Sequence, residues 1–158
     1  MNESTWSKLE TALGECALHE EILAEALDEH GEPTYSASTV EALTKSRLRL
    51  LDQMAYRFTK LQATLGQQVL PMLLDLAEEP LAQDAPFAQK LQRLERIGII
   101  PSAEQWRELR IARNTIAHEY PDAPELKAAA LNRFVQSAAE LLQFWKHVAN
   151  QGKRLGSL

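Results

Sequence analysis

The chain is poor in the residues that several classes of protein require. Its 158 residues include one cysteine, Cys16, so no disulfide can form within the chain and a reducing compartment is expected. No spacing of cysteine and histidine matches a structural zinc site, and the six glycines are isolated, so there is no glycine-rich phosphate loop. No apolar run approaches the roughly 18 to 20 residues that span a bilayer. We therefore expect no metal, no cofactor, no signal peptide or membrane anchor, and a cytoplasmic location.

Residues that favour strands are also scarce. The sequence has 6 Ile and 4 Val against 25 Leu and 22 Ala, so strong helix formers dominate the aliphatic residues. The length predicts one domain, and 45% hydrophobic with 25% charged residues is typical of a globular chain with a core. The sequence therefore predicts an all-α fold: an up-and-down bundle of about five helices over residues 1–151, followed by a frayed tail at 152–158.

The net charge of -5 is distributed unevenly along the chain. Residues 1–88 carry a charge of -9, whereas residues 89–158 carry +4. A basic half can mark a surface for an anion or a polynucleotide, and it can also reflect only which helices face water. The charge distribution is therefore compatible with a nucleic-acid partner and does not require one.

Apolar residues recur at helical spacing in five segments. Gly31 and Pro33 end the first segment, while Ser102 is expected to begin the fourth, which continues until Pro121 prevents further turns. The expected helices are, in order, residues 4–30, about 38–69, 87–97, 102–120 and 122–151, with a short apolar stretch at 72–77.

The second expected helix is long. Ser38 or Thr39 is positioned to cap its start, and its apolar residues keep a spacing near 3.5 for more than six turns, which is typical of a helix packed lengthwise in a bundle. Gly66 and Pro71 predict a kink or a break near its far end, because proline removes a backbone donor and clashes with the preceding turn.

The cysteine and three of the four histidines have structural interpretations. Cys16 lies on the apolar stripe of the first helix, which favours a small buried hydrophobic residue over a nucleophile. His19 and His147 lie within long helices and His30 at a helix end, where structural roles or compensation of the helix dipole are expected. His118 differs because of the residues around it.

One arginine falls where an arginine is unexpected. At about 100° per residue, Arg113 projects between Trp106 and Tyr120 on one side and Leu109 and Ile116 on the other, inside the apolar stripe of the fourth helix. A guanidinium is costly to bury without a partner. Its position suggests a carboxylate partner, an anion site or a subunit interface.

Other polar residues of this helix form a cationic edge. Asn114 and His118 are neighbours at i and i+4, next to Arg107, and Arg110 lies between them and Arg113. Arg113 and His118 are about 140° apart on the helix, so convergence needs the reach of the arginine, a distorted last turn or a second subunit. An arginine ion pair and a helix-terminal histidine with no role in chemistry also fit these facts.

The string RNTIAHEY, residues 113–120, resembles a known motif. It is similar to the Arg, polar residue, three residues, His motif of HEPN domains, in the extended Arg-x4-His-x-Tyr form of the toxins in HEPN/MNT toxin-antitoxin pairs. Such domains are helical bundles of about this size, and the expected order of helices resembles theirs over most of the chain.

The resemblance implies a homodimeric, metal-independent endoribonuclease in which two copies of the motif face each other across a cleft. His118 would act as general acid or base at the ribose 2′-OH and the leaving 5′-oxygen, and Arg113 would stabilise charge on the transition state. Asn114 would orient these groups or the phosphate, while Arg107 and Arg110 would bind RNA. The product would be a 2′,3′-cyclic phosphate, formed without a metal because the nucleophile is on the RNA.

The resemblance also assigns a role to Tyr120. It matches the tyrosine that the nucleotidyltransferase antitoxin of such a pair modifies with adenylate groups. An alternative is a non-catalytic HEPN protein that presents substrate to a nucleotidyltransferase. A third interpretation is a helical adaptor in which the motif occurs by chance.

Overall fold

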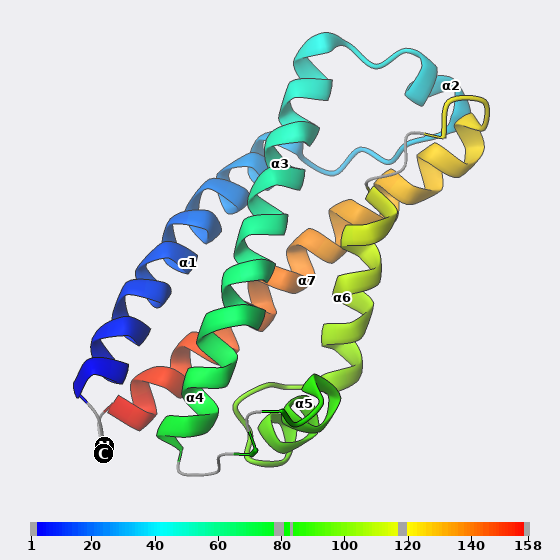
Figure 1. Cartoon of the computed structure of the whole chain (residues 1–158). Coiled ribbons are helices and arrows are strands. Elements are labelled where there is room, and N and C mark those ends of the chain that lie inside the picture. Colours follow the sequence, from blue (N-terminus) through cyan, green and yellow to red (C-terminus); the bar gives the residue numbers. More distant parts are fainter. Residues whose placement is uncertain (1–2, 78–80, 83, 117–119, 157–158) are drawn as a thin grey trace.

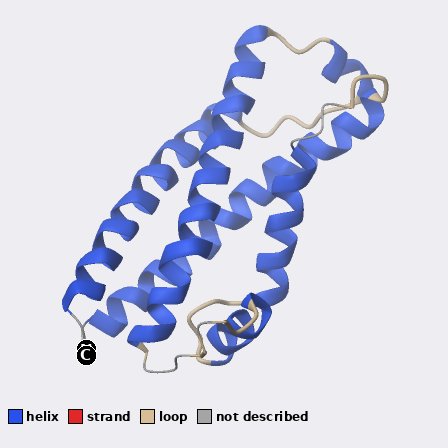
Figure 2. Ribbon diagram, viewed as in Figure 1, coloured by secondary structure: helices blue, strands red, loops and turns tan. Residues whose placement is uncertain are grey.

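The computed structural model describes residues 3–77, 81–82, 84–116 and 120–156. Within these ranges the chain is helical and contains no strand (Figure 2). The predicted all-α fold is confirmed. The elements are α1 (Glu3–His30), α2 (Ala37–Glu41), α3 (Lys45–Thr64), η1 (Leu65–Val69), α4 (Leu70–Leu76), α5 (Phe87–Arg96), α6 (Ala103–Ile116) and α7 (Pro124–Gly156).

The long helices form an up-and-down bundle (Figure 1). α1 packs along α3 and also contacts α7, and α6 packs against α7 and contacts α3. The short α5 crosses the lower end of the bundle and contacts both α4 and α6. The apolar spacing of the sequence predicts this arrangement, because the residues of the α3 and η1 seam are buried: Leu50, Met54, Phe58, Leu61, Leu65 and Val69.

The second helix begins differently from the prediction. Ser36, and not Ser38 or Thr39, is the N-cap: its Oγ accepts the Thr39 N–H at 3.3 Å, and the Thr39 Oγ1 accepts the Ser36 N–H at 2.7 Å. This capping box starts the short α2. A second cap follows, because the Thr44 Oγ1 accepts the Arg47 N–H at 3.1 Å and begins α3. The prediction of one continuous helix from residue 38 is wrong, since two caps divide the segment.

The loop between α1 and α2 is attached to α7. The Tyr35 N–H donates to the Oδ1 of Asn132 at 2.7 Å, and the Asn132 Nδ2 donates to the Tyr35 carbonyl at 2.9 Å. The Tyr35 hydroxyl donates to the Nε2 of His30 at 2.6 Å, while the His30 Nδ1 donates to the Gly31 carbonyl at 3.0 Å. His30 is 1% exposed and fully engaged in this loop, so its structural interpretation is confirmed.

Near the far end of the second helix, where a kink or a break is expected, the structure has a widened turn. Between α3 and α4 lies the π-helical turn η1, in which the N–H of Leu70 donates to the carbonyl of Leu65, five residues earlier. Pro71 lacks an N–H and its ring would clash with the carbonyl four residues before it, and a wider turn accommodates both. The irregularity predicted from Gly66 and Pro71 is therefore a π-helical turn, and the helix continues from α3 through this turn into α4 without the predicted break.

Cys16 belongs to the core. Its side chain is completely buried on α1, and burial followed by the charge of Glu15 raises the pKa of the thiol to about 12. The thiol is therefore protonated at neutral pH and poorly nucleophilic. The prediction of a small buried hydrophobic residue is confirmed.

The end of the chain differs from the expected frayed tail. α7 continues through Gly152 to Gly156. Gly152 is buried, and a Cβ there would lie 3.6 Å from Leu73; one at Gly156 would lie 3.5 Å from the ring of Trp6. The missing side chains let the last turns of α7 lie close to α1 and α4, so tertiary packing extends the helix beyond the point where its composition predicts an end.

Two helical glycines give opposite predictions for the same substitution. A Cβ at Gly66 would lie 2.8 Å from the Cζ2 of Trp106, a ring that is 2% exposed, whereas nothing lies within 4 Å of a Cβ at the exposed Gly14 in α1. We expect Gly66→Ala to lower the free energy of unfolding by about 1 to 3 kcal/mol through overpacking. Gly14→Ala should raise it by up to about 1 kcal/mol through helix propensity.

Denaturant unfolding of both variants beside the parent chain measures these changes. A Gly66→Ala variant at least as stable as Gly14→Ala would show that the ring of Trp106 does not lie against this turn.

Candidate functional site

The start of α6 is fixed by two caps. The Ser102 Oγ accepts the Gln105 N–H at 3.1 Å, and the Glu95 carboxylate of α5 accepts the Ala103 N–H at 2.7 Å. The predicted start at Ser102 is confirmed. Because Glu95 belongs to the last turns of α5, the cap also ties the orientation of α6 to α5.

α6 buries one face and presents arginines beside it. The buried residues are Ala103, Trp106, Leu109 and Ala112, and the Trp106 ring lies 5.4 Å from that of Phe144 in α7. Arg113 is exposed, so the expectation that it lies inside the apolar stripe is wrong. Its long side chain leaves the border of the stripe and ends in water, which avoids the cost of burying a guanidinium. Burial of Arg113 therefore supplies no argument for a subunit interface.

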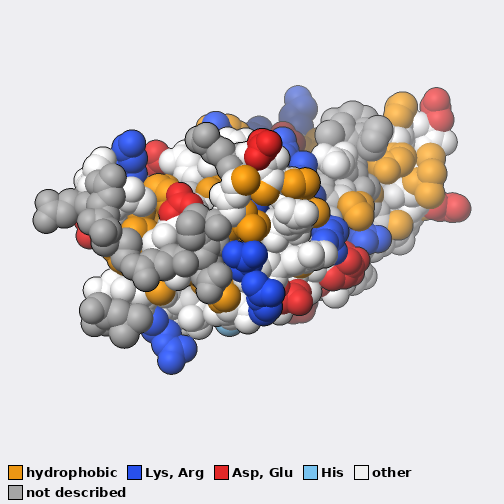
Figure 3. Space-filling model, turned by 60° about the horizontal axis from the view of Figure 1, so that its bottom comes forward, with side chains coloured by type: hydrophobic (Ala, Val, Ile, Leu, Met, Phe, Trp, Pro, Cys, Tyr) orange, Lys and Arg blue, Asp and Glu red, His pale blue; other side chains and the backbone are white. Residues whose placement is uncertain are grey.

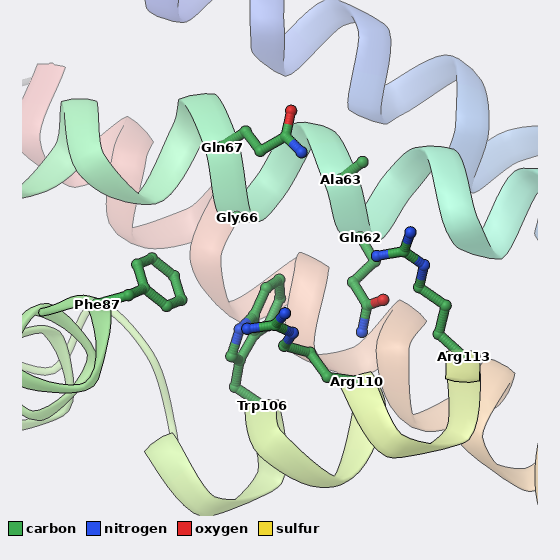
Figure 4. Close-up of a pocket in the computed structure, with 8 residues that line it drawn as sticks. All are labelled: Gln62, Ala63, Gly66, Gln67, Phe87, Trp106, Arg110 and Arg113. Carbon is green, nitrogen blue, oxygen red and sulfur yellow. The ribbon is translucent and has the colours of Figure 1, made fainter. Parts of the chain in front are cut away.

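A pocket of about 210 Å³ lies between α3, the π-helical turn, α5 and α6, and is called the Gln62 pocket below. Figure 4 shows the amide of Gln62 pointing from α3 toward α6, while Arg110 and Arg113 leave α6 on the side that faces α3. Its lining residues are Gln62, Ala63, Gly66, Gln67, Phe87, Trp106, Arg110 and Arg113.

The base of the Gln62 pocket contains buried polar atoms without partners. Gln62 and Trp106 are each 2% exposed. Neither the Nε2 nor the Oε1 of Gln62, nor the Nε1 of Trp106, has a hydrogen-bond partner among the described residues. Buried polar groups in proteins are nearly always paired, and each unpaired one costs about 1 to 3 kcal/mol. Three such atoms on two residues that line one pocket make the Gln62 pocket the candidate functional site.

The mouth of the Gln62 pocket is positively charged. Arg110 and Arg113 are exposed, and within the described part of the chain neither guanidinium has an ion pair or a hydrogen bond. No acidic residue is among those that line the pocket where the structure describes it. Two arginines without a neighbouring carboxylate attract an anion, and the forked guanidinium suits a phosphate.

Not every predicted site residue reaches this pocket. Arg107 pairs with Glu104 at 3.0 Å and does not line the pocket, and the exposure of both side chains makes the pair weak. Asn114 is exposed and does not line the pocket either. The structure thus brings together Arg110 and Arg113 of the predicted set and leaves Arg107 and Asn114 outside.

The remaining two predicted residues follow the described end of α6. His118 lies outside the described residues. Tyr120 is half-buried and not helical, with a backbone φ of 48°, and its carbonyl accepts the Ala123 N–H at 3.2 Å. The expectation that the helix carries Tyr120 as far as Pro121 is wrong: a left-handed φ is incompatible with a continuing right-handed helix.

The pocket residues outside α6 were not predicted as site residues. Gln62 had a detectable signal, because it follows Phe58 by four residues and precedes Leu65 by three, which places a polar side chain on the buried face of α3. Gly66 and Phe87 had none, since their contribution depends on how α3 and α5 approach α6.

The other histidines lie elsewhere. The His147 Nε2 donates to the Gly98 carbonyl at 2.9 Å, and the His19 Nδ1 lies 3.0 Å from the Arg57 guanidinium. Burial and, secondarily, the charge of Arg57 lower the pKa of His19. Both residues have structural partners, as predicted.

Comparisons of the chain with protein families, with curated proteins and with solved structures find no match.

In the described ranges no helix is long and apolar enough to cross a membrane, and no group of three side chains that could bind a metal ion lies together. On the face shown in Figure 3, Lys and Arg side chains occur in separate groups among acidic and apolar ones. The Gln62 pocket, with its buried polar atoms and two arginines, is the candidate functional site.

The unpaired amide predicts that Gln62→Leu stabilises the protein. Leucine has a similar volume and removes two unpaired polar atoms, so the free energy of unfolding should rise by about 1 kcal/mol or more. Gln68→Leu, at an exposed glutamine of the following π-helical turn, should change the free energy of unfolding by less than about 0.5 kcal/mol. Denaturant unfolding without ligand measures both. Destabilisation by Gln62→Leu would show that the amide is paired in solution.

Proposed function

We propose that the protein is a metal-independent endoribonuclease, the toxin of a toxin-antitoxin pair of the HEPN/MNT kind. The observation that carries the proposal is the pair of exposed guanidiniums, Arg110 and Arg113, at a pocket whose described lining has no carboxylate. They lie on the helix that leads into the His118 segment. A polyanionic substrate with a phosphate at the reacting centre suits this arrangement.

The proposed reaction needs no metal because its nucleophile is the 2′-OH of the RNA. His118 takes or gives the proton at the 2′-OH and at the leaving 5′-oxygen, and the 2′-oxygen attacks the phosphorus while the bond to the 5′-oxygen breaks. Arg113 stabilises the negative charge that develops on the phosphorane-like transition state. Arg110 binds the same phosphate beside Arg113, Asn114 orients it, and Arg107 binds a neighbouring phosphate of the RNA. The products are a 2′,3′-cyclic phosphate and a 5′-hydroxyl.

The proposal includes a homodimer. Two copies of the α6 segment facing each other supply both motif arginines and both histidines to one cleft. The exposure of Arg113 leaves its guanidinium available to such a shared site.

Cleavage should depend on both motif residues. In the presence of a chelator, His118→Ala should lower the rate of RNA cleavage by about 10² to 10⁴. Arg113→Ala should also lower it strongly while the fold is kept, because that side chain is exposed. Arg133→Ala, at an exposed arginine of α7, is the matched control and should retain the parent rate. A gel assay on labelled RNA, with sedimentation to establish the dimer, measures these outcomes.

Two results would contradict the proposal. The first is equal cleavage by the parent and the His118→Ala variant, which would point to a contaminating nuclease. The second is cleavage that appears only with added divalent metal.

We further propose that a nucleotidyltransferase antitoxin inactivates the enzyme at Tyr120. The phenol oxygen attacks the α-phosphorus of ATP, the α–β phosphoanhydride bond breaks, and pyrophosphate leaves. Tyr120 follows His118 by two residues and is half-buried in a left-handed turn. An adenylate there, two residues after His118 in the sequence, would add bulk and negative charge and would repel RNA.

Tyr120→Phe should preserve folding and cleavage but abolish modification by the cognate nucleotidyltransferase supplied with ATP. Mass spectrometry of the co-expressed pair should show adenylate mass on the peptide that contains Tyr120. Full neutralisation of the Phe variant would show that the antitoxin acts by binding alone. Modification of Tyr120 on a chain that never cleaves RNA would favour the non-catalytic substrate-presenting protein instead.

A further inference from the structure

We propose that the Gln62 pocket holds the pyrimidine base of a ribonucleotide, with the phosphate of that nucleotide on Arg110 and Arg113. The inference rests on the proposed function for the statement that the nucleotide belongs to an RNA chain. The base assignment itself comes from the polar atoms, the size and the aromatic walls of the pocket.

The unpaired atoms define the edge that a ligand must present. Gln62 offers an amide N–H donor and a carbonyl acceptor, and Trp106 offers an indole N–H donor. The complementary edge therefore has two acceptors and one donor. Uracil presents O2, O4 and N3–H, and cytosine presents O2, N3 and the exocyclic N4–H, so both match. The pairing edge of adenine has one acceptor and one donor, and that of guanine has two donors and one acceptor.

The size of the pocket favours a single ring. Its volume of about 210 Å³ is below the roughly 300 to 1,000 Å³ of sites that enclose drug-sized ligands. Phe87 is half-buried in the wall, where its ring can stack on a base, as aromatic side chains do in proteins that bind single-stranded RNA. Gly66 also lines the pocket and adds no side chain, so the ring of Trp106 occupies the space that a Cβ would need.

The two arginines complete a nucleotide site. Arg110 and Arg113 are exposed, whereas Gln62 and Trp106 are buried, so the charged groups are nearer to water than the groups that would read the base. This separation suits a ligand with a flat polar ring at one end and a phosphate at the other. The polar atoms at the base are shielded from water, so side chains that line the pocket must move as the base enters, and exposed side chains change rotamer rapidly.

Mononucleotide binding by the full chain tests the assignment. The probes are the 3′-monophosphates of uridine, cytidine, adenosine and guanosine, measured by titration calorimetry and by the indole ¹⁵N–¹H resonance of Trp106. We expect the two pyrimidine nucleotides to bind at least about five-fold more tightly than the purines. They should shift the Trp106 resonance while those of Trp6 and Trp145 stay in place.

The variants separate base recognition from phosphate recognition. Gln62→Leu should weaken binding of the pyrimidine nucleotides by at least about five-fold and remove the preference over purines. Gln68→Leu, the exposed matched control, should bind like the parent. Arg110→Gln should weaken binding of all four nucleotides to a similar extent and keep the preference.

Equal binding of all four nucleotides, a Trp106 resonance that does not move, or no binding at millimolar concentration would each overturn the inference. Cleavage of RNA by the same sample distinguishes it from the proposed function. Cleavage without pyrimidine binding overturns the pocket assignment alone, whereas pyrimidine binding with no cleavage overturns the ribonuclease alone.

Discussion

The close approach of Gly66 to Trp106 is the contact on which the candidate site depends. Pro71 cannot complete a regular helical turn, and the chain widens into a π-helical turn just before it. That turn carries a residue without a side chain at the point where a Cβ would lie 2.8 Å from the Trp106 ring. The ring fills this space, and α6 is held close to α3 with its arginines beside Gln62. A local backbone constraint thus sets the position of side chains from another helix.

The buried amide of Gln62 is a cost that the fold tolerates. Most of the described interior is aliphatic and aromatic. Its other buried polar residues are Thr64, Ser137 and His30, and the ring of His30 is hydrogen-bonded on both sides. A protein selected only for stability would place leucine at position 62, since that removes unpaired polar atoms at little change in volume. Retaining an amide and an indole N–H at the base of one pocket is the pattern of a site where stability is lost in exchange for recognition.

The sequence predicts the helices well and the site only partly. The bundle is predicted by the content of leucine and alanine and by the apolar seam through Phe58, because these act through helix propensity and periodicity. Pro71 predicts the irregular turn that precedes it. The extra cap at Ser36 depends on which of several neighbouring hydroxyls bonds the backbone. Arg113 lies on the predicted helix but is exposed. The angle on a helical wheel gives the position of the Cα atom, and a long flexible side chain at the border of the apolar stripe can extend from there into water.

The exposure of Arg110 and Arg113 bears on how the proposed enzyme would work. Long side chains without partners in the described structure sample many rotamers, so the fold alone does not fix their charges in space. A bound phosphate would have to restrict both arginine side chains to a few rotamers, and the entropy lost in doing so lowers the affinity of the site for the phosphate. A base anchored at Gln62 and Trp106 would hold the phosphate between the guanidiniums and so make this ordering nearly intramolecular. In the proposed enzyme, recognition at the buried end of the pocket would therefore set how well the exposed end stabilises charge.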